Sequence, residues 1–253
     1  MSEFLSLNAW HFMLVAARMI TVFMNLPGIG ERYVPTNVRL LIGVGTTVVV
    51  MPVVAPYLPL QPTMPWLIFA FIFNEILVGL MIGLSARVIM SATHTAGHIA
   101  SMSSGLGIAS MMDPSQGQQG AIVGALLGIS AILLIFVLDL HHLIIASVRD
   151  SYLSFQPGQL PPFADLSQAH TRLVGDAFLL GFQISSPFIV ASLVLYTAMG
   201  ILSRLMPQIQ IFFVVQPIQI LLSLFVFMAT FSAMLFWFTQ KFEDVMRQFL
   251  GLA

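Results

Sequence analysis

The stretch "LMPQIQIFFVVQPIQILLSLFVFMATFSAMLFWFTQ", Leu205–Gln240, contains no Asp, Glu, Lys or Arg. It is longer than the ~20 apolar residues that a helix needs to cross the hydrocarbon core of a bilayer. Leu40–Asn74 and Ala177–Ser203 are charge-free runs of the same kind. The three runs predict an integral membrane protein, or a chain that is buried among other membrane subunits.

Composition supports this interpretation and excludes several functions. The 253 residues are 58% hydrophobic and 8% charged, whereas a soluble domain is roughly 25% charged. The net charge of -1 argues against a nucleic-acid partner, because binding phosphates requires clustered Lys and Arg. The absence of cysteine excludes disulfides and thiolate metal sites. Neither a Walker A loop nor a G-x-S-x-G elbow occurs, so we expect no enzyme.

Apolar runs and their Pro, Gly and charged boundaries predict the helices. We expect an all-α polytopic membrane protein of about six long, partly broken helices that form one domain over residues 1–253. The N-terminus lacks a basic n-region, so we expect no cleaved signal peptide. The polar run Val88–Ala109 is expected to extend the third helix. The segments are about 8–26, 37–56, 65–90, 119–148, 174–204 and 209–240.

Charged residues stand within the apolar segments, at Arg18, Glu75, Arg87 and Asp139. Such groups are costly in hydrocarbon, so they face other protein or a water-filled path. Glu75 and Arg87 lie twelve residues apart, which at ~100° per residue places them roughly 120° apart around a helix. We therefore expect each to find its partner elsewhere. Snorkelling and ordinary helix-to-helix hydrogen bonding remain alternatives for each of these residues.

The histidines give only weak signals of chemistry. His94 and His98 share a helix face at i, i+4, but "HTAGH" lacks the Glu of a zinc-protease HExxH motif and a nearby third ligand. We expect neither a metal nor another cofactor. "DLHH", Asp139–His142, is compatible with a proton relay, although adjacent histidines at a helix end more often mark a membrane interface.

Glycines at four-residue spacing predict close helix packing. Gly79 and Gly83 form one GxxxG motif, and Gly120, Gly124 and Gly128 form two in succession. The lack of a side chain at these positions allows two helix backbones to approach closely.

Two stretches interrupt the helical pattern. In "SSGLGIASMMDPSQGQQG", Ser103–Gly120, glycines relax the backbone and Asp113–Pro114 starts a turn. In Arg204–Gln219, Pro207 and Pro217 each remove a helical hydrogen bond. Irregular backbone at membrane depth is tolerated only where protein or a cavity surrounds it. The two breaks therefore suggest a pathway or a closely packed assembly of several subunits.

Five motifs, in this order, resemble the FliR family, whose members are the flagellar export-gate subunit related to the corresponding injectisome subunit. The resemblance spans nearly the whole chain, and "DLHH" departs slightly from the Gly-His or similar pair expected there. The motifs are Arg18, Pro27, Glu31, Arg32, Pro35 and Arg39; "NEILVGLMIG" at 74–83; "SGLGIASMMDP" at 104–114; "HHLIIASVRDSY" at 141–152; and "RLMPQIQIFFVVQP" at 204–217.

The resemblance implies a non-enzymatic subunit of the bacterial inner membrane at the flagellar basal body. One FliR-like chain would join several copies of FliP and FliQ in a helical assembly that forms the pore for unfolded export substrates. FlhB and FlhA would act beside it. In this family the helices are bent and largely raised out of the membrane plane, so about six helices need not mean six membrane spans.

The resemblance also assigns roles to the two breaks. The loop would be a plug that seals the pore, and the unbranched side chains of its methionines would adapt to varied polypeptides. A plain solvent-exposed connection is the alternative. The expected plug residues are Gly105, Gly107, Ile108, Met111, Met112, Asp113, Pro114 and Gly117. The expected pore or subunit contacts in the second break are Arg204, Pro207, Gln208, Gln210, Phe212, Phe213 and Pro217.

Other functions remain as alternatives. A secondary transporter with discontinuous helices would require corresponding breaks in two related halves. The sequences around 105–117 and 207–217 are not visibly related. A membrane scaffold or insertion factor and the equivalent subunit of a virulence injectisome are further alternatives.

Overall fold

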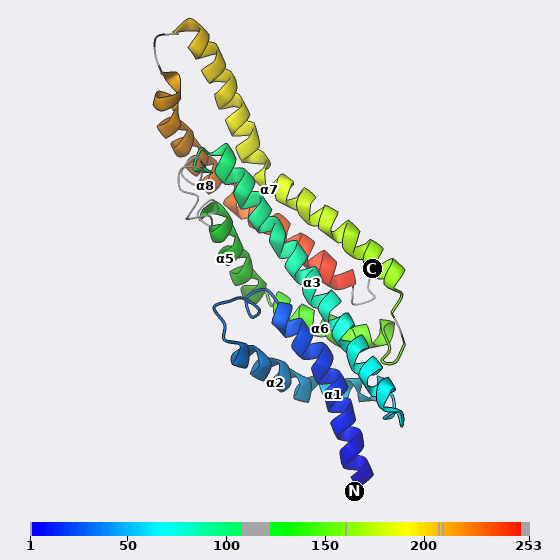
Figure 1. Cartoon of the computed structure of the whole chain (residues 1–253). Helices are drawn as coiled ribbons and strands as arrows, with labels where there is room; N and C mark the ends of the chain where they lie inside the picture. Colours follow the sequence, from blue (N-terminus) through cyan, green and yellow to red (C-terminus); the bar gives the residue numbers. More distant parts are fainter. Residues whose placement is uncertain (1, 108–121, 160, 207, 209, 249–253) are drawn as a thin grey trace. The chain divides into compact units, whose positions relative to one another are not determined.

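The computed structural model describes residues 2–107, 122–159, 161–206, 208 and 210–248. Figure 1 shows that these residues form helices joined by turns, and none of them lies in a strand. The expected all-α class is therefore confirmed. The elements are α1 Ser2–Asn25, α2 Thr36–Val54, the short 3-10 helix η1 Ala55–Tyr57, α3 Pro65–Ser103, α5 Ile122–Val137, α6 Leu140–Ser154, α7 Phe163–Leu205 and α8 Ile211–Gln248.

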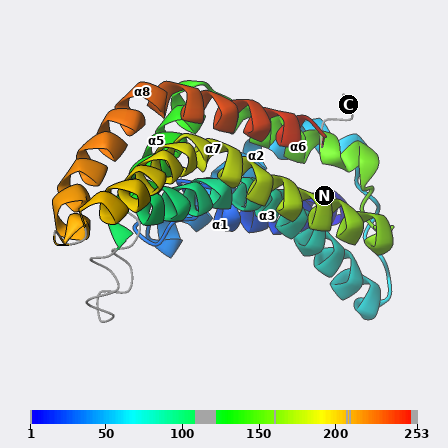
Figure 2. The same ribbon diagram turned by 90° about the horizontal axis from the view of Figure 1, so that it is seen from above.

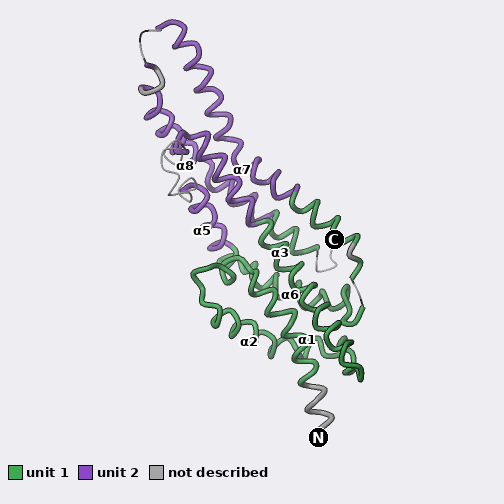
Figure 3. Tube along the Cα trace, viewed as in Figure 1, with its two compact units in different colours: residues 1–89, 135–174, 241–253 green, residues 90–134, 175–240 purple. Residues whose placement is uncertain are grey.

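The chain divides into two compact units, which Figure 3 distinguishes by colour. Unit 1 comprises residues 1–89, 135–174 and 241–253, and unit 2 comprises residues 90–134 and 175–240. A boundary falls inside each of α3, α5, α7 and α8, so these four helices contribute residues to both units. The expectation of a single domain stays a prediction.

In unit 1, glycines bring helix backbones together. A Cβ on Gly79 of α3 would lie 2.5 Å from the carbonyl oxygen of Arg18 on α1. A Cβ on Gly83 would lie 2.8 Å from the Cβ of Asn25. The two glycines thus stand where α3 and α1 approach closely, and their assignment as helix-packing residues stays a prediction. Gly43 of α2 contacts Ile20 of α1 in the same way, and buried side chains such as Leu14, Met19, Ile82, Ile144 and Phe242 fill this core.

In unit 2, Gly97 of α3 faces Gly124 of α5 so closely that a Cβ on Gly97 would overlap the Gly124 backbone. Gly124 therefore lies where α3 and α5 approach closely, and its role in helix packing stays a prediction. Gly128 lies one turn further along α5, where a Cβ would make ordinary contact with His94. Gly120 lies outside the described residues. Figures 1 and 2 both show α8 turning back along α7 after the break between them.

The structure refines the helix boundaries. Four helices are long and apolar enough to cross a membrane, or five spans if α5 and α6 together count as one. The single helix expected over 119–148 is wrong, because α5 and α6 meet at a 70° bend. Asp139 at this bend is the one described non-glycine residue with positive φ, at 56°. The helix α7 begins at Phe163, ahead of the segment expected at about 174–204, because a polar helix end carries no apolar signal.

Many large apolar side chains point outward, above all on the helices of unit 2. Soluble monomers rarely expose continuous apolar patches of this kind, which mark contact with lipid or with other subunits. Strongly exposed examples on α8 are Leu221, Phe225 and Met228, and on α5 they are Ile122, Ile129 and Leu133.

Candidate functional site

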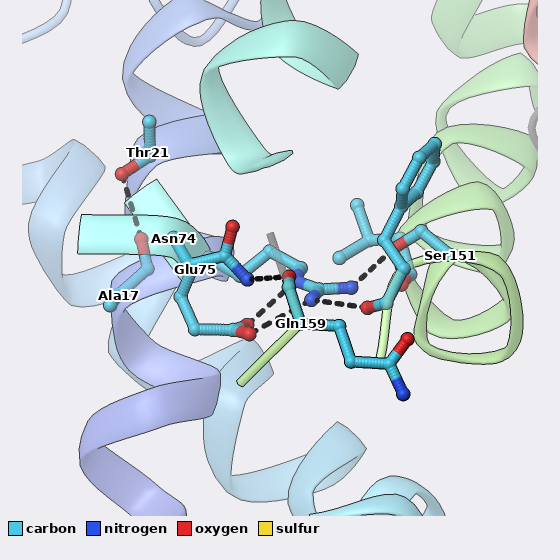
Figure 4. A network of polar contacts seen from close by, with 9 residues as sticks. Ala17, Thr21, Asn74, Glu75, Ser151 and Gln159 are labelled. Atoms are coloured by element: carbon cyan, nitrogen blue, oxygen red, sulfur yellow. Dashed lines mark hydrogen bonds and ion pairs between the residues drawn. The ribbon is translucent and has the colours of Figure 1, made fainter. Parts of the chain in front are cut away.

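Arg18 of α1 forms a buried ion pair with Glu75 of α3 in unit 1, shown from close by in Figure 4. Its Nε donates to one carboxylate oxygen of Glu75 at 2.7 Å, and its Nη2 donates to the other at 2.9 Å. Both side chains are 0% exposed. Two parallel bonds of this kind give the strongest and most directional pairing available to an arginine and a carboxylate. The expectation that Glu75 finds a partner other than Arg87 is confirmed.

The remaining donors of Arg18 bind α6 and the residue that follows it. Nη1 donates to the hydroxyl of Ser151 at 2.8 Å, and Nη2 donates to the carbonyl of Phe155 at 3.0 Å. The guanidinium carbon stands 3.7 Å from the centre of the Tyr152 ring. A buried ion pair repays its loss of hydration only when its other hydrogen-bonding groups are also satisfied. Arg18 meets this condition and links α1, α3 and α6.

A neighbouring contact secures the loop after α6. Asn74, next to Glu75 on α3, donates its amide to the carbonyl of Gln159 at 2.8 Å (Figure 4). Gly158 in this loop has φ 88° and packs against the ring of Phe71. The carboxylate of Glu75 and the guanidinium of Arg18 are already paired with each other. The network therefore holds the helices together rather than forming a site for proton transfer.

Two other arginines of unit 1 hold the turn between α1 and α2. Arg87 of α3 donates to the carbonyl of Gly30 at 3.2 Å. Arg39 of α2 donates from Nε to the carbonyl of Val34 at 3.0 Å and from Nη2 to the carbonyl of Glu31. Arg87 therefore has its own partner, as its angular separation from Glu75 predicts.

In unit 2, two glutamines of α8 bind the chain where α3 ends. Gln219 donates its amide to the carbonyl of Ser103 at 2.8 Å and to the hydroxyl of Tyr196 on α7 at 3.0 Å. Gln216 donates to the carbonyl of Gly105 at 3.2 Å. Both glutamines lie in the stretch Arg204–Gln219, where the sequence predicts an interruption of the helical pattern, but the carbonyls that they bind carry no sequence signal.

Nearly the whole chain is similar to known bacterial export proteins. Residues 9–245 match the family described as "Bacterial export proteins, family 1". The flagellar biosynthetic protein FliR of Caulobacter vibrioides is 34% identical over 92% of this chain and 93% of its own length. FliR of Bacillus subtilis is 27% identical over 95% of each chain. FliR of Escherichia coli is 28% identical over 85% of this chain and 80% of its own length.

The chain belongs to the FliR family of bacterial export proteins. The resemblance inferred from five sequence motifs is thereby confirmed. Family membership and the long apolar helices together make this a membrane protein of flagellum biogenesis and protein export.

Two of the plug residues that the FliR resemblance implies are described. Gly105 lies in the turn after α3 with φ 77°, and Gly107 is buried close to Met102. The glycine at 105 is required by its conformation, since L side chains rarely adopt positive φ. The other expected plug residues, Ile108, Met111, Met112, Asp113, Pro114 and Gly117, lie outside the described residues.

The second break implied by the FliR motif is present but shorter than predicted. The helix α7 ends at Leu205 and α8 begins at Ile211, and Arg204, Gln208 and Gln210 are exposed around this break. Pro217 lies inside α8, so the expectation that the break extends to it is wrong. A proline removes one helical hydrogen bond, and surrounding packing often preserves the helix. Pro207 and the side chains of Phe212 and Phe213 lie outside the described residues.

Asp139 stands at the bend between α5 and α6. Its Oδ1 lies 3.4 Å from Nδ1 of His142, and their side chains are 74% and 69% exposed. With His141 they form the one described group of three residues whose ligand atoms lie within 4.8 Å of one another. Such exposure is consistent with a membrane interface. The expectation that no metal binds stays a prediction.

Proposed function

We propose that this chain is a non-enzymatic, channel-forming core subunit of the flagellar type III protein export gate. It would join several copies each of FliP and FliQ in the bacterial inner membrane, at the flagellar basal body. FlhB and FlhA would act beside this assembly. The observation that carries the proposal is the similarity to flagellar FliR over 92% of this chain and 93% of the relative.

The exposed apolar faces support a role inside an assembly. Leu221, Phe225 and Met228 on α8 are each at least two thirds exposed in the isolated chain. Contact with hydrophobic partner subunits would remove this surface from solvent. The charged side chains Arg18 and Glu75, in contrast, are already paired internally and require no partner subunit.

We propose that the loop from Ser103 to Gly120 is the plug of the pore. Its sequence supports this role, because glycines allow rearrangement and Met111 and Met112 offer adaptable apolar side chains. Around the second break, the exposed residues Arg204, Gln208 and Gln210 would contact the pore or a neighbouring subunit.

The composition of the assembly tests the proposed function. The C-terminally tagged chain would be co-expressed with the neighbouring genes, extracted in mild detergent and weighed by native mass spectrometry. We expect one copy bound to several copies of small hydrophobic proteins. A lone chain or a homo-oligomer would contradict the export-gate proposal and favour a secondary transporter.

Permeability tests the plug. Removing residues 108–117 should make resting cells leaky to small ions while the assembly still forms. The matched control removes a comparable length from the loop between α2 and α3, which has no proposed sealing role. Unchanged ion permeability in an intact assembly would contradict the plug assignment.

A further inference from the structure

Gln216 and Gln219 lie three residues apart on α8, and both direct their amide groups at the end of α3. Their acceptors are backbone carbonyls, those of Gly105 and Ser103. Gln219 is only 4% exposed, so its amide has little access to other partners. The two contacts join helices that are more than a hundred residues apart in sequence.

The Ser103 carbonyl is one that a helix end leaves without an N–H donor, and the Gly105 carbonyl follows it in the turn. The last carbonyls of an α-helix have no N–H ahead of them in the helix, and a buried carbonyl without a donor is destabilising. Ser103 is the last residue of α3, and Gly105 lies in the turn that follows. The α8 glutamines therefore cap α3 from outside, a task that local C-terminal motifs usually perform.

Gly105 is fitted to this contact in two ways. Its φ of 77° favours glycine, and a Cβ at this position would lie 2.5 Å from the Nε2 of Gln216. The glycine thus leaves room for the Gln216 amide beside the turn. Tyr196 of α7 completes the arrangement by accepting the second amide hydrogen of Gln219.

We infer that Gln216 and Gln219 are positioning residues that fix the backbone of Ser103–Gly107, so that the first turns of α8 set where the chain leaves α3. These turns directly follow the break between α7 and α8. The significance for export rests on the proposed function, in which these residues form the beginning of the plug. The contact itself does not depend on that function.

Cysteine labelling tests the inference, since the chain has no cysteine of its own. Leu106→Cys places a half-buried reporter in the held turn. The rate of its reaction with a maleimide would be measured in the purified full-length chain with any partners that co-purify. Gln216→Met and Gln219→Met remove the donors at similar side-chain length. Each should raise the labelling rate about fivefold, the effect expected from losing one hydrogen bond.

Two further variants separate hydrogen bonding from general loosening of α8. Ser223→Ala is the matched control, because the Ser223 hydroxyl donates only within its own helix, to the Ile220 carbonyl at 2.8 Å. It should leave the rate unchanged. Gln219→Leu removes the donor without introducing a group that can be charged or protonated, so it should label as fast as Gln219→Met.

Parent-like rates in both methionine variants would overturn the inference, as would equal acceleration by Ser223→Ala. Slow labelling in Gln219→Leu would also overturn it, since apolar packing rather than donation would then hold the turn. If a methionine variant does not accumulate, hydrogen exchange of the Ser103–Gly107 amides in Gln219→Leu gives the same decision. Native mass spectrometry of the same samples reports separately on the proposed assembly, so either idea can fail alone.

Discussion

The polar contacts of the two units are built from different chemistry. In unit 1 a full positive charge on Arg18 meets a full negative charge on Glu75, and Ser151 and Phe155 accept further hydrogen bonds from Arg18. In unit 2 the neutral amides of Gln216 and Gln219 bind backbone carbonyls. A buried charge without its partner is severely destabilising, whereas breaking a neutral hydrogen bond costs little free energy. The first arrangement suits a permanent junction, and the second suits a contact that can be released.

The largest effect is expected from removing one partner of the ion pair. Arg18→Met leaves the Glu75 carboxylate buried and unpaired, which should cost about 3–5 kcal/mol of unfolding free energy. Thermal unfolding in detergent, or the accumulated level of the chain in membranes, measures this loss. The double variant Arg18→Met/Glu75→Leu is the control, because it buries no charge and should recover much of the stability. If the double variant were no more stable than Arg18→Met, the unpaired charge would not be the cause of the lost stability.

A smaller loss is expected when the ion pair stays and one of its supports is removed. Ser151→Ala deletes the hydroxyl that accepts from Nη1 of Arg18 at 2.8 Å. A hydrogen bond to a charged group contributes about 1.5–3 kcal/mol, so the substitution should lower the free energy of unfolding by that amount. Ser167→Ala is a suitable control, since this exposed hydroxyl donates within its own helix to Ala164. Equal effects of the two substitutions would contradict the special role of Ser151.

The turn after α3 should respond to backbone strain. Gly105→Ala forces an L side chain into φ 77°, at a cost of about 1–2 kcal/mol. Hydrogen exchange should report this cost locally, as faster exchange of Ser104–Gly107 with little change in α1. Gly200→Ala provides the contrast, because a Cβ there meets nothing within 4 Å and its helical conformation suits alanine. Faster exchange throughout the chain in Gly105→Ala would show that the turn is not a local unit.

Much of the fold and part of the candidate site could be predicted from the sequence, and the predictions that failed did so for physical reasons. The charge-free runs predicted the apolar helices, because a bilayer leaves few other solutions for them. The helix spacing of Glu75 and Arg87 correctly separated them, but Arg18 as the partner of Glu75 follows only from tertiary packing. The bend at Asp139 was missed, because neither proline nor glycine stands there. The shorter second break was missed because Pro217 is held within α8.

The smallest loss of stability is expected from removing one hydroxyl from the neutral amide contacts of unit 2. Tyr196→Phe removes one hydroxyl that accepts from the neutral amide of Gln219, the counterpart of removing Ser151 from the charged network. Because Gln219 keeps its bond to the Ser103 carbonyl, the loss should be about 0.5–1.5 kcal/mol, below that of Ser151→Ala. Both variants would be unfolded under the same detergent conditions. If Tyr196→Phe lowered the stability more than Ser151→Ala, the amide contacts would be a fixed junction like the ion pair. The distinction between a permanent and a releasable contact would then be wrong.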